Sequence, residues 1–257
     1  MRTLSIILSL SFFCFGCTET PDTSKNATDT TNSKEKDILG KHTVKTTHQT
    51  DNTSSEIPYE NGLKNGLAKQ HYPNGKIWKE SPYKDGKLEG IVKVYDRNGK
   101  LLRTAEYHKG KLDGSYIKYF KSGKPKYTAK YSGGLILPGI IEKNYRNEMI
   151  KQPEITYSFE DRLATDNEYY AHFKLSGKAN DVNFFALRDA TEWNPHTELS
   201  VYRLPTENND QATMTFKIDP GYFIATDVHI YVTYKTSDGN EAVVYKQVNV
   251  AAENISY

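Results

Sequence analysis

The chain has 257 residues, of which 37% are hydrophobic and 12% aromatic, and its 34 Lys and Arg nearly balance its 32 Asp and Glu for a formal net charge of +2. After the first few residues, no stretch approaches the roughly 18 consecutive apolar residues that a membrane-spanning helix requires. This composition excludes a polytopic helical membrane protein and predicts a soluble body.

The N-terminal segment has the pattern of an export signal. Arg2 precedes an apolar run over residues 4–15. As a helix this run would rise about 18 Å, which is too short for a hydrocarbon core of roughly 30 Å. Its length and flanks predict a cleaved signal peptide over residues 1–16.

The run ends at Cys14-Phe15-Gly16-Cys17, a small residue before a cysteine, with polar residues after it. This junction resembles the lipobox of bacterial lipoproteins, although that family usually has Leu at the position of Cys14 and a small residue at that of Phe15. The resemblance implies acylation of Cys17, by chains such as palmitate, and a membrane anchor, in the outer membrane. The cysteine content is consistent with a lipoprotein. Cleavage would remove Cys14 and acylation would consume Cys17, so no disulfide could form. The alternative is an ordinary signal peptide with a chance cysteine at the junction.

Residues 17–56 are rich in Thr, Ser, Asn, Asp and Lys. So little apolar surface cannot offset the entropy of ordering a chain. We therefore expect a disordered tether, with a root-mean-square reach of about 35 Å.

Residues 57–148 contain an internal repeat with a 24-residue period. Four positions keep this period, one of them a tyrosine and three of them glycines. They are Tyr59, Tyr83, Tyr107 and Tyr131; Gly62, Gly86 and Gly110; Gly66, Gly90 and Gly114; and Gly75, Gly99 and Gly123. Asn-Gly pairs at 74–75 and 98–99 favour hairpin turns because glycine tolerates positive φ. Each unit therefore predicts one β-hairpin, and stacked hairpins would share a continuous core as a solenoid.

The segments 83–90 and 107–114 share the pattern Tyr-x-x-Gly-Lys-Leu-x-Gly. Each is followed by a further tyrosine and a glycine turn. The pattern resembles the bacterial variant of the MORN (membrane occupation and recognition nexus) repeat, without the Glu-Trp of many eukaryotic copies. The resemblance implies an elongated β scaffold for protein or membrane contacts and no enzyme activity. A fourth unit degenerates over residues 134–139, where we expect a cap.

Two interpretations of the repeat positions remain. The tyrosines could form a ligand-binding strip or a structural ladder. The glycines fit turns better than a phosphate-binding loop, because no predicted helix follows them.

The charge is unevenly distributed. Residues 57–131 contain 17 basic and 7 acidic residues, a net of +10, whereas residues 132–257 contain 11 basic and 18 acidic residues, a net of −7. A basic repeat would attract polyanions such as anionic lipid, anionic glycan or an acidic protein. The lysines could instead protect strand edges, or the repeat could dock on the chain's own acidic C-terminal domain. Export argues against nucleic acid.

Residues 149–257 predict a β-sandwich, because short runs of β-prone residues recur at regular spacing. The expected strands are 155–159, 168–176, 182–188, 198–204, 212–218, 228–235 and 242–250. Seven such strands suggest an immunoglobulin-like sandwich, but there is no cysteine pair, and Trp193 lies in a loop-like stretch. The strand count alone fits another sandwich topology equally well. The predicted fold is thus all-β, a hairpin-repeat solenoid followed by this sandwich.

The densest group of reactive side chains lies in residues 189–198 and includes a single histidine, His196. A polar loop explains it better than an active site, and with Trp193 and Tyr202 it is a candidate recognition loop. No catalytic residue, metal ligand or cofactor site is assigned. The sequence predicts a non-enzymatic, membrane-anchored interaction protein with a protein or anionic glycan or lipid partner. The alternatives are a structural spacer or immunity-type protein and, third, a hydrolase.

Overall fold

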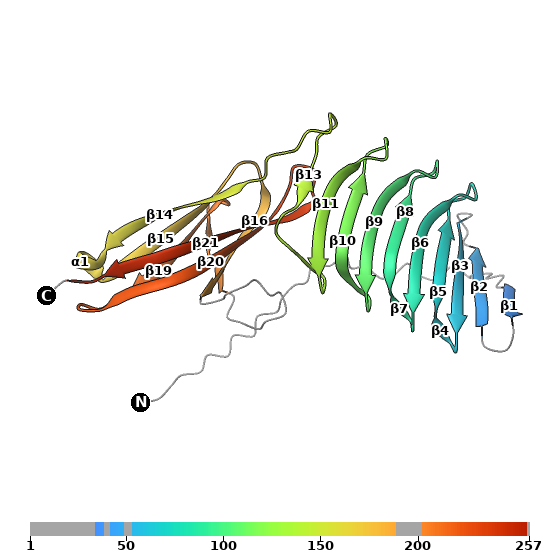
Figure 1. The fold of residues 1–257 in the computed structure, drawn as a ribbon, viewed down its shortest axis with the longest axis horizontal. Helices are drawn as coiled ribbons and strands as arrows, with labels where there is room; N and C mark the ends of the chain where they lie inside the picture. Colours follow the sequence, from blue (N-terminus) through green and yellow to red (C-terminus); the bar gives the residue numbers. More distant parts are fainter. Residues whose placement is uncertain (1–33, 39–41, 49–52, 189–201, 256–257) are drawn as a thin grey trace, which may run out of the picture. The chain divides into compact units, whose positions relative to one another are not determined.

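A computed structural model describes residues 34–38, 42–48, 53–188 and 202–255. This part of the chain is nearly all β, and its one helix is the four-residue α1 (Leu163–Asp166). The β-strands form one 13-stranded sheet and two 4-stranded sheets, all with antiparallel pairing (Figure 1). The predicted all-β class is confirmed.

The 13-stranded sheet, here called the repeat sheet, follows the chain order from β1 to β13 with short strands at its margins. Its strands are β1 (Lys34–Ile38), β2 (His42–His48), β3 (Ser54–Glu60), β4 (Leu63–Lys64), β5 (Gly66–His71), β6 (Ile77–Lys84), β7 (Lys87–Leu88), β8 (Gly90–Tyr95), β9 (Leu101–His108), β10 (Lys111–Tyr119), β11 (Pro125–Ser132), β12 (Leu135–Ile136) and β13 (Ile141–Glu142).

The hydrogen bonds of the repeat sheet recur with the period of the sequence. The turn amides of Gly75, Gly99 and Gly123 each donate 2.9 Å bonds to the carbonyl three residues earlier. Asn147, with φ of 66°, makes the same bond to Asn144. The repeat therefore continues one turn beyond the last glycine of the pattern, because asparagine also tolerates positive φ. The degenerate residues 134–139, expected to form a cap, lie within this continuation, with β12 and β13 both paired to β11.

The glycine that ends the Lys-Leu-x-Gly segment leaves room for the Glu106 side chain in the unit of β10. Gly114 has φ of +112°, and a Cβ built there would lie 2.1 Å from Oε2 of Glu106, which accepts the Ser115 amide. At the turn glycine Gly99, with φ of +86°, a Cβ would meet no atom within 4 Å. Both positions disfavour an L side chain, but Gly114 adds a clash.

We therefore expect Gly114→Ala to lower the free energy of unfolding more than Gly99→Ala does. The turn substitution should cost about 1–2 kcal/mol from backbone strain, and the other should cost at least about 1 kcal/mol more because the Glu106 bond to Ser115 is displaced. Urea unfolding of both variants measures the difference. Equal losses would contradict the steric role of Gly114.

The structure corrects the tether predicted over residues 17–56 for residues 34–38, 42–48 and 53–56, which are the described part of that segment. Strands β1 and β2 and the start of β3 lie within it, and β2 pairs with β3 along its whole length, from His42 to His48. The polar composition was a misleading guide because strands at the end of a sheet need little apolar surface. The strand β2 contains β-branched residues such as Thr43, Val44 and Thr46, which suit a half-buried pleated surface. Its backbone pairs with groups of β3 that would otherwise have no hydrogen-bond partner.

Residues 154–188 and 202–253 form the sandwich. One sheet has the order β14 (Glu154–Arg162), β15 (Glu168–Ser176), β19 (Gln211–Lys217) and β18 (Thr206–Glu207). The other has β17 (Tyr202–Leu204), β16 (Asn180–Arg188), β20 (Phe223–Lys235) and β21 (Glu241–Glu253). Lettered in chain order with C′ after C, the sheets read A-B-E-D and C′-C-F-G, the immunoglobulin arrangement with one added edge strand.

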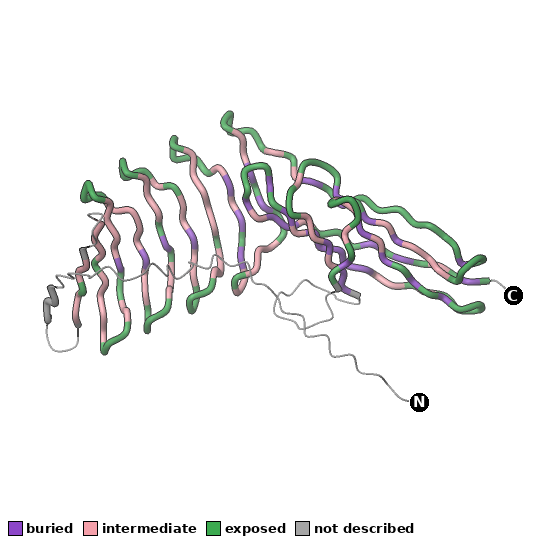
Figure 2. Tube along the Cα trace, turned by 180° about the vertical axis from the view of Figure 1, so that it is seen from behind, coloured by how far each residue is buried: buried purple, intermediate pink, exposed green. Residues whose placement is uncertain are grey.

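The last repeat and the sandwich share one hydrophobic core. Tyr127, Ala129 and Tyr131 of the repeat sheet belong to the same buried cluster as Phe173 and Val232 of the sandwich. Figure 2 shows buried residues crowded at this end of the repeat sheet, whereas its other strands are mostly intermediate. The last repeat is thus covered by the sandwich, and the earlier repeats keep one tyrosine-bearing face outside this core.

Candidate interaction surface

The strand register divides the side chains of the repeat sheet between two faces. Gly66 lies opposite Tyr83, Gly90 opposite Tyr107, and Gly114 opposite Tyr131. Because directly paired residues project to the same face, each glycine leaves space beside a tyrosine ring. We call this side the tyrosine face; it also carries Tyr59. The tyrosine and glycine periods of the sequence therefore describe one cross-strand arrangement.

The middle row of the tyrosine face consists mostly of small side chains. Their exposed fractions are 5% or less, so they are enclosed by their neighbours. They are Ala68, Ser81, Val92, Ala105 and Ala129. In β10 the row continues with Tyr116, which pairs with Ala105 and Ala129. Beyond it, the pairs Gln70–Lys79 and Val94–Arg103 bring the long side chains of glutamine, lysine and arginine to the same face. The face thus has a tyrosine margin and a margin that includes cations.

The two faces of the repeat sheet differ in where their negative charge lies. Lys45 lies 5.1 Å from the Tyr59 ring centroid and Lys64 lies 5.0 Å from that of Tyr83, both on the tyrosine face. Within the described strands β2 to β9, the strand carboxylates lie on the opposite face, by the alternation of side chains. They are Glu56, Glu60, Glu80 and Glu106. The tyrosine face of these strands therefore carries positive charge only.

The tyrosine face of the last repeat holds a hairpin of the sandwich. The turn between β20 and β21 closes with a 2.9 Å bond from the Thr236 amide to the Asn240 carbonyl. Lys118 Nζ donates to Asn240 Oδ1 at 2.5 Å, and the Tyr127 hydroxyl donates to the Glu241 carbonyl at 2.5 Å. This is the internal docking of basic repeat on acidic domain that the charge distribution left open; we call residues 236–241 the docked hairpin.

Two more contacts fix the docked hairpin. Lys126 Nζ forms an ion pair with Asp238 Oδ2 at 2.8 Å. The Glu142 side chain is 1% exposed, and its Oε1 accepts bonds from Thr236 Oγ1 at 3.1 Å and Asn240 Nδ2 at 2.5 Å. The buried carboxylate is therefore held by two neutral donors from the hairpin.

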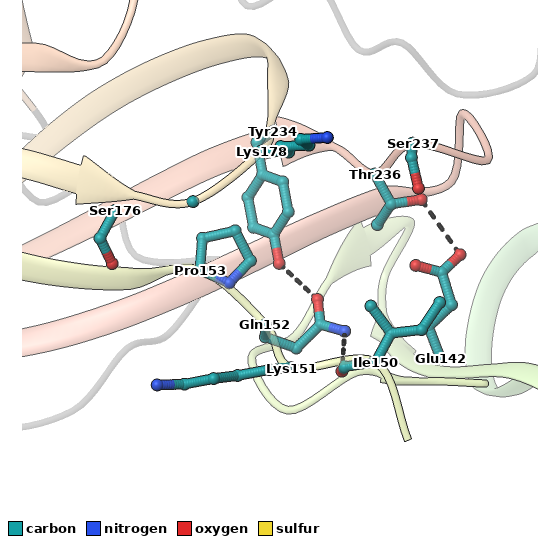
Figure 3. Close-up of a pocket in the computed structure, with 11 residues that line it drawn as sticks. Glu142, Ile150, Lys151, Gln152, Pro153, Ser176, Lys178, Tyr234, Thr236 and Ser237 are labelled. Atoms are coloured by element: carbon teal, nitrogen blue, oxygen red, sulfur yellow. Dashed lines mark hydrogen bonds between the residues drawn. The ribbon is translucent and has the colours of Figure 1, made fainter. Parts of the chain in front are cut away.

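Figure 3 shows the cavity next to this contact, with Glu142 reaching toward Thr236. The Tyr234 hydroxyl donates to Gln152 Oε1 at 2.7 Å, and Gln152 Nε2 donates to the Ile150 carbonyl at 3.1 Å. These bonds tie the segment that enters the sandwich to β20. The cavity lies within the junction of repeat and sandwich.

Burial shifts the pKa of groups at this contact. The pKa values of the Tyr127 and Tyr234 hydroxyls rise, mainly because burial disfavours their charged forms. The pKa of Glu241 rises mainly through burial, opposed by Lys235, by a bond from Tyr131 and by Lys118. Both tyrosines therefore act here as neutral hydrogen-bond donors.

The raised pKa of Glu241 predicts a pH dependence. Protonation is favoured in the folded state, so the contribution is most favourable at low pH and is lost as pH rises through the folded pKa. Glu241→Gln should remove this contribution. The melting temperature of the variant minus that of wild type should therefore increase as pH rises from 4 toward 8. Thermal unfolding across this range measures it. A difference that is constant with pH would contradict the assignment.

A second polar cluster lies on the outward face of the A-B-E-D sheet. His172 lies 3.2 Å from Glu160 Oε2 through Nε2 and 3.0 Å from Thr213 Oγ1 through Nδ1. The order carboxylate, imidazole, hydroxyl is that of an acid–base relay. The side chain of His172 is 39% exposed on a solvent-facing sheet. An exposed surface of this kind does not shield a substrate from water, as the closing of an active site does. We assign it no reaction.

Two comparisons with known proteins bear on the repeat sheet. The family described as the MORN repeat variant matches residues 64–85 and 88–109. Two of the hairpin units thus match MORN repeats. MORN repeats generally mediate protein or membrane interaction, which is compatible with a binding role for this sheet. No curated protein matches the chain. The units after residue 109 keep the periodic hydrogen-bond pattern of the MORN-like units before them.

Several residues singled out in the sequence lie outside the described residues. They include Cys17, Trp193 and His196, so the lipid anchor and the recognition loop stay predictions. In the part of the chain that is described, no helix has the length and apolarity to cross a membrane. Nor do the described residues contain a group of three or more His, Cys, Asp or Glu arranged to hold a metal ion.

The structure also brings forward residues that the sequence did not suggest. Glu142 lies one full repeat period after Lys118, and Tyr127 lies one period after Arg103. Extending the repeat count past the last glycine would have placed Glu142 on the tyrosine face. Its partners Thr236 and Asn240 carry no such signal, because their approach depends on tertiary packing.

Proposed function

We propose that this chain is a non-enzymatic interaction lipoprotein of a bacterial envelope, anchored in the outer membrane through Cys17. The MORN-like repeats and the sandwich together bind an envelope or surface partner. The observation that carries the proposal is the docked hairpin, because the tyrosine face of one repeat already acts as a protein-binding surface.

The charge distribution supports the same role. The contacts of Lys118 and Lys126 with Asn240 and Asp238 engage only the last repeat. The remaining positive charge of residues 57–131, a net of +10 over the whole segment, is available to steer a partner of opposite charge. Such steering is screened beyond about 8 Å at physiological ionic strength.

The anchor is tested by Cys17→Ser in cells that export the chain. Wild type should remain with washed membranes and give an acylated mature N-terminus by mass spectrometry, because two or more acyl chains bind a bilayer stably. The variant should appear in the soluble fraction. An unacylated wild-type N-terminus would contradict the lipoprotein assignment.

Binding is tested with the soluble Cys17→Ser protein added back to envelopes from cells that lack the chain. Saturable binding that weakens as salt is raised supports the proposal, since charge contributes to recognition. Absence of binding at low salt would instead favour the spacer role, in which the anchor alone holds the protein. Turnover of an envelope glycan would overturn the non-enzymatic assignment.

A further inference from the structure

We propose that the tyrosine face of the first three repeats, from Tyr59 to Tyr107, binds an acidic, extended protein segment in the way that the last repeat binds residues 236–241. This inference rests on the proposed function, because it specifies the chemistry of the partner. Positions one repeat period apart are equivalent in the sheet, so the contacts of the last repeat indicate what the earlier repeats can hold.

In the last repeat, two side chains of β11 hold Glu241. The Tyr131 hydroxyl donates to its carboxylate, and the Tyr127 hydroxyl donates to its backbone carbonyl at 2.5 Å. One unit earlier, the equivalent positions on β9 are Tyr107 and Arg103. Tyr107 therefore keeps the hydroxyl that contacts a carboxylate in the last repeat. Arg103 has a guanidinium where the last repeat has the Tyr127 hydroxyl.

The unit before that has the same pair on β6. Tyr83 and Lys79 stand four residues apart on one face, with Ser81 between them at the position of Ala105. A cation in place of the Tyr127 hydroxyl favours a carboxylate over a carbonyl, since charge-assisted hydrogen bonds are the stronger kind. The Arg103 guanidinium is a planar fork that matches a carboxylate. In this structure its Nη1 donates to the Tyr116 hydroxyl at 3.4 Å, so a ligand carboxylate would share or replace that contact. The upstream units therefore fit a ligand more acidic than the docked hairpin.

The geometry of the sheet sets the spacing of such a ligand. Equivalent positions in neighbouring units are two strands apart, roughly 10 Å. An extended chain covers this distance in about three residues. A partner segment running across the strands would therefore place carboxylates about three residues apart.

Two observations favour a protein segment over a membrane or nucleic acid. The occupant seen on this face is a polypeptide that offers backbone carbonyl and side-chain oxygen together. The positive charge beyond the middle row is also sparse, because Lys79 and Arg103 contribute one cation in each of two units and the first unit has Ser55 at this position. Polyanion surfaces call for denser charge, whereas half-buried tyrosine rings such as Tyr83 suit the apolar and polar groups of a peptide.

The test uses as the probe a labelled synthetic peptide of roughly twelve residues, with glutamate at every third position and neutral polar residues between, to match the spacing of the repeat units. The receptor is the chain from residue 18 to 257. The last repeat is occupied in the same chain, so probe binding reports the upstream units. At low salt, Lys79→Glu with Arg103→Glu should weaken binding at least tenfold. The matched control, Lys93→Glu with Lys130→Glu, makes the same charge change on the opposite face and should weaken it less than twofold. Circular dichroism and melting temperature check folding, and Lys79→Gln with Arg103→Gln replaces the first pair if charge reversal prevents folding.

Absence of probe binding at low salt would overturn the inference, as would equal loss in both charge-reversal pairs. It would also be overturned if anionic phosphatidylglycerol vesicles, but not the acidic peptide, bound the tyrosine face, since the partner would then be a membrane. Envelope binding without probe binding leaves the proposed function intact and removes only this partner. Probe binding without envelope binding removes the proposed function instead.

Discussion

Replacing Tyr127 with alanine should lower the free energy of unfolding by roughly 3–5 kcal/mol, the usual cost of deleting a large buried aromatic side chain. Tyr127 is 1% exposed, lies in the core shared by the repeat and the sandwich, and bonds to the Glu241 carbonyl. Urea unfolding followed by fluorescence measures the loss. Because the two parts share this core, we also expect one unfolding transition for wild type and two for the variant.

Tyr127→Phe is the matched control for this prediction. It keeps the ring and removes only the hydroxyl, so it should cost about 1 kcal/mol, or somewhat more because the Glu241 carbonyl loses its donor. If Tyr127→Ala cost less than about 1 kcal/mol, the repeat and the sandwich would be independent folding units. The shared core would then contribute little to stability.

Asn240→Ala should cost about 3 kcal/mol, since it removes one neutral side chain that serves two charged groups. The Asn240 side chain is 4% exposed, accepts from Lys118 and donates to Glu142. Alanine would leave an ammonium and a buried carboxylate each short of a hydrogen bond. Chemical denaturation measures the loss.

Ser237→Ala is the control for this second prediction, because Ser237 is an exposed residue of the same turn, and its substitution should change stability by less than about 0.5 kcal/mol. A double-mutant cycle of Asn240→Ala with Glu142→Gln should give a coupling energy on the order of 1 kcal/mol. Additive effects would show that the Asn240–Glu142 bond does not stabilise the docked hairpin.

The sandwich strands could be predicted closely because their signals are local. Val228, Ile230 and Val232 alternate inward, and the strand observed there, β20, extends to Phe223. The expected strand 212–218 corresponds to β19 (Gln211–Lys217). Turn chemistry was equally local, as for Gly99, whose positive φ the Asn-Gly pair predicted.

The other features of the fold depend on contacts between distant parts of the chain, and local sequence patterns do not predict such contacts. The strands over residues 34–48 were expected to be tether, because their polar composition says nothing of the strand edge on which they pair. The docked hairpin was only one of several alternatives for the charge distribution. Its contacts join residues far apart in the chain, such as Glu142 and Asn240, which no spacing rule on a single sequence connects.

The unbroken phase of the repeat, from the first turn at Gly75 to the last at Asn147, makes the protein modular in length. Inserting or deleting one whole unit upstream of β10 would preserve every contact of the sandwich, because Lys118, Tyr127 and Glu142 would keep their places relative to one another. A single residue inserted within a strand would instead turn inward residues outward. Gain or loss of complete units would therefore change how many residues of a partner the repeat sheet contacts. The last repeat and the sandwich would stay unchanged.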